Sequence, residues 1–275
     1  KNVDFSSKMP TTVTAVAGTE AEATVKIHLD SKDGPVIATI PLGNGGSFMS
    51  NLQIGTSKIT KSVTGKHDIY LSFGGEKGIG LDYIQFSHKV SAFGRIEAEI
   101  FDVGIQGTLH PRVQERDNFS NRKNVGYLDN GSWMRYPDVD FGENGAKKVT
   151  AAGSVADGGG ASLQFYIDSL NLQPFGTVTI PTNGNYDAVP LTAASEVLRK
   201  VTGVHDVYIK VNKGISIDYF EFEEASEDPL VTLLKELDRL KETALALSET
   251  EYTAETYQRL KSAIAQVDSV NRNDL

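Results

Sequence analysis

The chain has 275 residues, of which 39% are hydrophobic and 26 are glycine, as in an ordinary globular protein rich in turns, and this length predicts two or three domains. The formal net charge of −9 argues against partners that need a basic face, namely nucleic acid and an anionic membrane surface. The absence of cysteine excludes disulfides, thiolate metal sites and cysteine nucleophiles, and no apolar stretch is long enough for a membrane span.

Short β-strands are predicted through the first part of the chain. Runs rich in valine, isoleucine and threonine occupy 13–16, 23–29 and 36–40, and turn sequences such as SKDG and GNGG separate them. Apolar and polar side chains alternate along 23–30, which is typical of a strand with one face on a core and the other toward solvent. Strands at this spacing indicate an antiparallel β-sandwich or barrel.

The same pattern returns farther along the chain. The segment VTGKHDIYLSF at 63–73 is repeated as VTGVHDVYIKV at 201–211, and GIGLDYIQF at 78–86 returns as GISIDYFEF at 214–222. The offset stays between about 136 and 140 residues, which indicates a tandem duplication. The second copy, however, carries a lead-in at 95–136 that the first copy lacks.

The character of the chain changes after the second copy. A polar, acidic linker at 223–229 precedes leucines at helical spacing, and Asp228 with Pro229 is a typical helix start. A second helix is predicted from Thr253. The predicted fold class is therefore mainly β, with two antiparallel β-sandwich (jelly-roll) modules in tandem and a short C-terminal α-helical hairpin. The predicted domains are an incomplete sandwich at 1–90, a complete sandwich at 91–224 and a helical module at 225–275.

Three motifs of the second copy occur together in a fixed order. RIEAEIFD opens the copy at 95–102, GYLDNGSW lies at 126–133, and GISIDYFEF closes it at 214–222. This combination resembles family 6 carbohydrate-binding modules and shares part of its pattern with the related family 35 modules. The first copy resembles only the later two thirds of such a module. The helical tail, mainly 252–270, is similar to the FIVAR-type helical modules of secreted glycosidases.

Acidic residues at the start of the second copy are candidates for a metal site. Glu97 and Glu99 stand two residues apart, so on a strand their carboxylates would share one face. Like charges this close raise each other's pKa unless a cation lies between them, and Ca²⁺ prefers such oxygen ligands. The resemblance implies a structural calcium ion held by Glu97, Glu99 and Asp218, with a backbone carbonyl near Asp117. Two solvated strand acids are the alternative. The first copy has Asp82 in place of Asp218 but lacks the partner acids, so no complete calcium site is expected there.

Aromatic side chains in loops are candidates for contact with a glycan, because sugars present flat apolar C–H faces to aromatic rings. The resemblance implies a loop cleft between Tyr127 and Tyr186. The family usually has an asparagine two residues before the closing Asp218, whereas this chain has Ser216. A serine cannot make the paired donor and acceptor contacts of an amide, so we expect the cleft to be weakened or changed in specificity.

The resemblance also implies a second cleft, on the concave face of the sandwich. It would use Trp133 together with an acid earlier in the chain, Glu115, or with Gln114 in its place. Trp133 is the only tryptophan of the chain, and a lone tryptophan in a strand is as readily part of the core. Both interpretations of Trp133 stay open at this point.

The predicted function is non-catalytic binding of a polysaccharide or oligosaccharide, as the accessory region of a secreted multimodular glycoside hydrolase of a Gram-positive bacterium. The catalytic domain would belong to the same original polypeptide. No nucleophile elbow is present, and the recurring His67 and His205 are interpreted as organisers of a turn. The alternative is a structural spacer or protein-docking unit with degenerate clefts. A self-contained hydrolase is disfavoured, because no carboxylate pair stands out beyond the acids assigned to calcium.

The first copy lacks the segment that corresponds to 95–136. A sandwich without these opening strands would expose its core and a raw sheet edge, which proteins avoid. We therefore expect a second polypeptide piece beside residues 1–90 to complete the first module.

Overall fold

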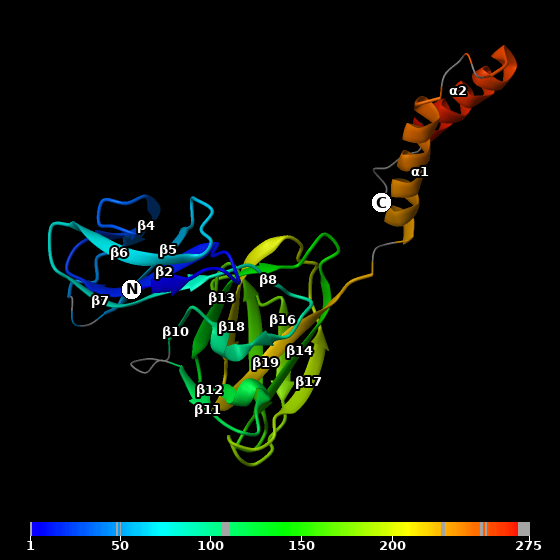
Figure 1. Cartoon of the computed structure of the whole chain (residues 1–275). Helices are drawn as coiled ribbons and strands as arrows, with labels where there is room; N and C mark the ends of the chain where they lie inside the picture. Colours follow the sequence, from blue (N-terminus) through cyan, green and yellow to red (C-terminus); the bar gives the residue numbers. More distant parts are fainter. Residues whose placement is uncertain are drawn as a thin grey trace. The chain divides into compact units, whose positions relative to one another are not determined.

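The computed structural model describes residues 2–47, 49, 51–105, 111–226, 229–247, 250 and 252–268 (Figure 1). Contacts divide the chain into a β-rich unit, Lys1–Ala225, and a helical unit, Ser226–Leu275. The helical unit holds α1 (Pro229–Leu245) and α2 (Ala254–Asp268), which contact each other. The predicted fold class is confirmed, while the predicted helix start at Asp228 lies outside the described residues.

The first sandwich consists of two antiparallel sheets, with strand orders β1-β6-β3-β4 and β5-β2-β7. The strands are β1 (Asn2–Asp4), β2 (Thr12–Thr19), β3 (Ala23–Leu29), β4 (Val36–Leu42), β5 (Gln53–Lys58), β6 (Lys66–Gly75) and β7 (Ile79–Ser87). Along β3, Val25 and Ile27 are buried in the core while Lys26 is exposed, so the predicted alternation is confirmed.

The second sandwich has the sheets β10-β13-β18-β15-β16 and β11-β12-β19-β14-β17. A short strand, β9, pairs with β19, and β8 pairs in parallel with β13. The strands are β8 (Val90–Ser91), β9 (Ile96–Glu97), β10 (Val103–Ile105), β11 (Arg112–Glu115), β12 (Lys123–Leu128), β13 (Trp133–Asp140), β14 (Ala146–Ser154), β15 (Ala161–Ile167), β16 (Gly176–Ile180), β17 (Leu191–Glu196), β18 (Val204–Val211) and β19 (Ile215–Glu224). Two 3₁₀ helices, η1 (Ala98–Ile100) and η2 (Ser120–Arg122), lie between strands.

Equivalent residues make equivalent contacts in the two copies. Phe5 meets Phe86 edge-on with ring centroids 5.1 Å apart, as Phe141 meets Phe222 at 5.0 Å. His67 places Nδ1 2.9 Å from Asp30 Oδ2 and Nε2 3.0 Å from the Thr64 carbonyl. His205 makes the same two contacts with Asp168 and Thr202 at 2.8 Å each. Each histidine therefore organises the turn before its strand, as predicted.

The two sandwiches meet through a polar contact. Arg135 on β13 forms an ion pair with the fully buried Asp102, with Nη2 2.5 Å from Oδ2. The same guanidinium donates hydrogen bonds to the hydroxyls of Thr14 (2.8 Å) and Thr56 (2.7 Å) in the first sandwich. The Tyr83 hydroxyl of β7 adds a hydrogen bond to the Asp102 carbonyl, at 3.1 Å. These contacts use the outer face of the β5-β2-β7 sheet, because the neighbours Val13 and Ala15 of Thr14 point into the core.

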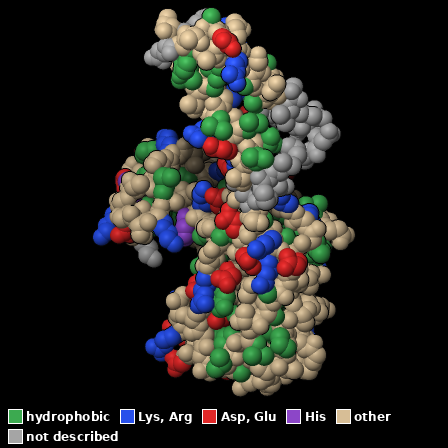
Figure 2. All heavy atoms as spheres, turned by 90° about the vertical axis from the view of Figure 1, so that its right-hand side faces the viewer, with side chains coloured by type: hydrophobic (Ala, Val, Ile, Leu, Met, Phe, Trp, Pro, Cys, Tyr) green, Lys and Arg blue, Asp and Glu red, His purple; other side chains and the backbone are tan. Residues whose placement is uncertain are grey.

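Neither described helix is long and apolar enough to cross a membrane. On the face shown in Figure 2, lysine and arginine side chains are interspersed with aspartate and glutamate. In the helical unit, Leu233 and Leu240 of α1 are exposed, so part of the apolar side of α1 is uncovered.

Candidate functional site

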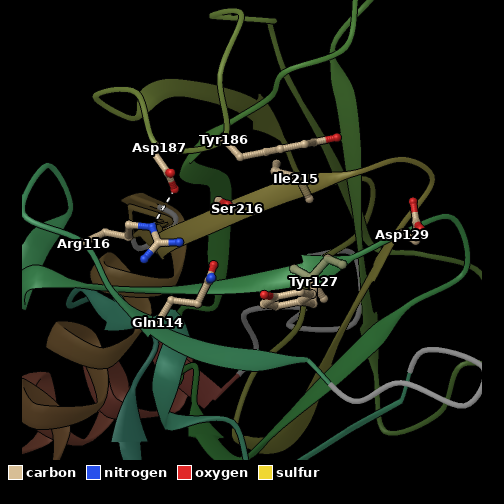
Figure 3. Close-up of a pocket in the computed structure, with 9 residues that line it drawn as sticks. Gln114, Arg116, Tyr127, Asp129, Tyr186, Asp187, Ile215 and Ser216 are labelled. Carbon is tan, nitrogen blue, oxygen red and sulfur yellow. Dashed lines mark hydrogen bonds and ion pairs between the residues drawn. The ribbon is translucent and has the colours of Figure 1, made fainter.

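A cleft of about 400 Å³ lies where β11 and β12 meet the start of β19. It is lined by Gln114, Arg116, Tyr127, Leu128, Asp129, Tyr186, Asp187, Ile215 and Ser216. Figure 3 shows Tyr127 and Tyr186 on opposite sides of β19, which carries Ser216 between them. The structure therefore brings together the three residues expected in the loop cleft.

A β-bulge presents Tyr127 to the cleft. Val125 pairs with Ile217 and Leu128 with Ile215, so Gly126 and Tyr127 together stand opposite the single residue Ser216. Tyr127 has a φ of 57°, in the left-handed region that non-glycine residues rarely adopt, and its side chain is 54% exposed. Such a conformation persists only where its surroundings hold it, and it is typical of binding sites.

A cation also contacts one face of the Tyr127 ring. The Arg112 guanidinium lies over the ring, with Cζ 5.1 Å from the ring centroid. This is within the range of a cation–π contact. Gln114, two residues after Arg112 on β11, lays its side-chain amide over Gly126. A Cβ at Gly126 would overlap this amide. The absence of a side chain at Gly126 thus lets the Gln114 amide lie across β12 at the bulge.

Tyr186 forms the opposite wall. Its side chain is 37% exposed, and its hydroxyl donates a hydrogen bond of 3.3 Å to Asp157. Partial burial, followed by the Asp157 charge, raises the pKa of this phenol above its ordinary value, so it stays a neutral donor. A Cβ at Gly214 would overlap the Tyr186 hydroxyl, so the glycine leaves room for the ring.

Charged residues tie the Tyr186 loop to β11. Arg116 Nε donates to Asp187 Oδ1 at 2.6 Å (Figure 3). Asn118 Nδ2 donates to the Asp187 carbonyl at 3.0 Å. Arg116 and Asp187 line the cleft, yet neither belongs to a motif that marks it as a site residue in the sequence. Arg116 directly follows β11, and continuing the alternation of Arg112 and Gln114 by one step is the signal that could have found it.

The structure does not bring Trp133 and Glu115 together. Trp133 belongs to β13, whereas Glu115 belongs to β11 in the other sheet, on the face opposite to Gln114. Trp133 is not a core residue either. It alternates with the buried Met134, and its ring lies 5.8 Å from that of Tyr208 on the outer face of the sheet.

The predicted metal ligands lie near one another, but not on one strand. Glu97 ends β9, whereas Glu99 is in the 3₁₀ helix η1. The expectation that both carboxylates share one face of a strand is therefore wrong. Ser120 lies between two of the predicted ligands, Glu97 and Asp218. Its Oγ is 3.0 Å from Glu97 Oε2 and 2.5 Å from Asp218 Oδ1. The Ser120 N–H also donates to Asp218 Oδ1, at 2.9 Å.

Glu99 carries an unsatisfied buried oxygen. Its Oε2 has no hydrogen-bond partner, and burial, with the charges of Glu97 and Asp218, raises the pKa of this carboxyl above its ordinary value. A half-buried carboxyl with one unsatisfied buried oxygen, near two other acids, has the oxygen chemistry that a hard cation prefers. Among the described residues, no group of three or more His, Cys, Asp or Glu side chains is placed so that it could hold a metal ion by itself, and this includes Glu97, Glu99 and Asp218. Backbone carbonyls and waters would have to complete the coordination of Ca²⁺.

The sequence of the chain is similar to a family of carbohydrate-binding modules and to parts of two larger enzymes. The family description "Carbohydrate binding module (family 6)" matches residues 1–88 and 106–224. Endo-1,4-beta-xylanase A of Thermoclostridium stercorarium is 28% identical over 235 residues, which are 82% of this chain and 34% of that protein. Arabinoxylan arabinofuranohydrolase of Bacillus subtilis is 28% identical over 138 residues, or 48% of this chain and 26% of that protein.

The chain thus spans between a quarter and about a third of these curated relatives. Among solved structures, a family 6 module from Clostridium cellulolyticum in complex with xylose is 27% identical, with a TM-score of 0.44. The match covers 49% of this chain and 100% of that module. Because the family match takes in both sandwiches and most of the chain, the chain belongs to family 6 of the non-catalytic carbohydrate-binding modules.

Proposed function

We propose that the second sandwich binds a xylan or arabinoxylan chain in the cleft between Tyr127 and Tyr186. The observation that carries this proposal is the pair of exposed tyrosines held on opposite walls of one cleft. Two such rings offer apolar surface to both faces of a sugar unit. The choice of xylan is supported by the relatives, which are named as a xylanase and an arabinoxylan arabinofuranohydrolase.

The cleft is ordered before any glycan binds. The bulge and Arg112 hold Tyr127, while Asp157 and the Arg116–Asp187 pair hold the wall that carries Tyr186. Binding then loses little side-chain entropy, which favours affinity. The side chains of Gln114 and Asp129 are left to bind sugar hydroxyls at the rim. Ser216 lies buried at the floor, where a hydroxyl takes the place of the family's amide.

A structural calcium ion held by Glu97, Glu99 and Asp218 is part of the proposal. The unsatisfied Glu99 oxygen and the raised pKa of its carboxyl support it. Bound calcium would supply the positive charge that these three carboxylates lack. The ligands would then fasten β9 and η1 to β19, next to the Ser120 turn that leads into β12 and its bulge.

We further propose that the chain is an accessory region of a secreted glycoside hydrolase of a Gram-positive bacterium. The cleft would hold the catalytic domain on its polysaccharide and so raise the effective substrate concentration. The helical unit, as a FIVAR-type module, would be a spacer or docking unit. The exposed Leu233 and Leu240 of α1 support that second role.

Isothermal titration calorimetry with soluble arabinoxylan, xylo-oligosaccharides, a mixed-linkage β-glucan and a galactan tests the binding proposal. Wild type should bind the two xylose-based ligands best, and Tyr186→Ala should weaken that binding. Tyr70→Ala is the matched control, because Tyr70 is an exposed tyrosine of the first sandwich, outside the cleft. Equal binding by both variants, or no binding of any glycan by wild type, would refute the proposal.

A further inference from the structure

A cation without an acidic partner stands beside the cleft. Arg112 lies on β11 opposite Gly126 of β12, next to the bulge that carries Tyr127. The residue is exposed, and its guanidinium carbon is 5.1 Å from the centroid of the Tyr127 ring. In the described part of the chain, no carboxylate forms an ion pair with Arg112. Its charge is therefore free to meet an anionic group of a ligand.

The two arginines that follow in the chain are engaged by acids. Arg116 forms an ion pair with Asp187, with Nε 2.6 Å from Oδ1. Arg122 forms another with Asp117, with Nη2 2.6 Å from Oδ1. Both of these guanidinium charges are cancelled by carboxylates of the same module. Of these three arginines, Arg112 is the one whose only contact with another side chain is a tyrosine ring of the cleft.

The opposite wall of the cleft is acidic. Burial, followed by the charge of Asp157 and then that of Asp129, raises the pKa of the Tyr186 phenol, so both carboxylates act at this wall. Figure 3 shows Asp129 and Arg116 on opposite sides of Tyr127. An anionic ligand group is repelled from the acidic wall. The favourable place for such a group is therefore beside the Tyr127 ring, where the unpaired guanidinium lies.

We propose that Arg112 makes the cleft select xylan that carries a uronic acid substituent. Substituents on a xylan backbone are either neutral, as arabinose is, or carry a carboxylate, as glucuronic acid does. A xylose unit stacked on the Tyr127 ring brings its substituent to the edge of the ring, and the forked N–H groups of a guanidinium match the two oxygens of a carboxylate. The inference rests on the proposed function, because it needs the xylan backbone in the same cleft.

The chain offers a matched control for a stacked arginine. Arg95 is also exposed, and its guanidinium carbon lies 3.9 Å from the centroid of the Tyr219 ring. Neither Arg95 nor Tyr219 lines the cleft. Replacing Arg95 therefore removes one exposed positive charge and one cation–π contact, as replacing Arg112 does, but at a place where no sugar is expected.

Calorimetry with two ligands tests the proposal. One is a xylo-oligosaccharide with a single glucuronic acid substituent, and the other is the same molecule with that carboxyl reduced to an alcohol. Wild type should bind the acid about three- to fivefold more tightly, as a well-placed exposed ion pair allows. Arg112→Met should abolish this preference, Arg112→Lys should keep part of it, and Arg95→Met should leave it unchanged. Raising sodium chloride from about 50 to about 500 mM should reduce the wild-type preference.

Each variant is judged by the ratio of its two affinities, so a weaker hold on the Tyr127 ring that affects both ligands equally does not mimic the expected result. Equal affinity of wild type for the acid and the reduced ligand would overturn this inference and leave the proposed function standing. A preference for the acid that survives in Arg112→Met would overturn it as well. Failure of wild type to bind either ligand would contradict the proposed function, and this inference with it.

Discussion

Replacement of Tyr127 by glycine separates the two properties of this residue, its ring and its strained backbone. A tyrosine side chain has roughly 200 Å² of surface, of which the 54% exposed fraction leaves about 110 Å² for a ligand. A sugar that covers half of this area removes about 55 Å² from water, worth about 1.4 kcal/mol at about 25 cal/mol per Å². Loss of the ring should therefore weaken glycan binding about tenfold.

The strained backbone at the same position is measured by comparing Tyr127→Gly with Tyr127→Ala. The left-handed backbone at φ 57° costs a non-glycine residue about 1–2 kcal/mol, while glycine loses about 0.5–1 kcal/mol in backbone entropy. Tyr127→Gly should thus be more stable than Tyr127→Ala by about 0.5–1 kcal/mol. Urea unfolding measures this difference, and calorimetry with xylohexaose measures the Kd. Equal stability of the two variants would refute the strain argument, and unchanged Kd values would refute the role of the ring.

Four further changes have expected outcomes. Gly214→Ala should weaken glycan binding without unfolding the module, because the new Cβ displaces the Tyr186 ring; unchanged affinity would contradict this. Asp102→Ala should lower the free energy of unfolding in urea, by less than the about 3–5 kcal/mol of a wholly unpaired buried charge, because Arg135 keeps only Asp206, 3.9 Å away; adding Arg135→Met should recover part of the loss. Calcium at about 100 times its Kd should add about 2.7 kcal/mol to the free energy of unfolding, and Glu99→Gln should remove that gain. The Asp30 carboxylate, then the Thr64 carbonyl, raises the pKa of His67, so the folded state holds this proton more tightly. That contribution is complete below about pH 6.5 and is lost as the pH rises through the raised pKa. His67→Gln should flatten the fall in melting temperature over this window, and an unchanged slope would contradict the assignment.

Local patterns were enough to predict the architecture, whereas the walls of the cleft were implied by the resemblance to family 6 modules. Alternation along β3 and leucine spacing in α1 are properties of neighbouring residues, so they can be read without tertiary structure. Tyr127, Tyr186 and Ser216 were found through motifs at separated positions, and the fold brings those positions to one cleft.

Features that depend on distant contacts could not be predicted. The Arg116–Asp187 ion pair joins residues 71 positions apart, and nothing local to either residue indicates the other. The Arg135–Asp102 pair depends on how the two sandwiches meet. Glu99 was placed on a strand because IEAE alternates, yet β9 ends at Glu97 and the chain turns into η1. Trp133 and Glu115 lie in different sheets, and the assignment of strands to sheets depends on pairing between distant segments.

The central claim is that glycan binds between Tyr127 and Tyr186. Amide chemical shifts of the whole chain, recorded during titration with xylohexaose, test it most directly. We expect saturable shifts concentrated at Gly126, Tyr127 and Tyr186, with no response around Trp133 and Tyr208. Shifts confined to the Trp133 face, or a spectrum that does not change at millimolar ligand, would contradict it.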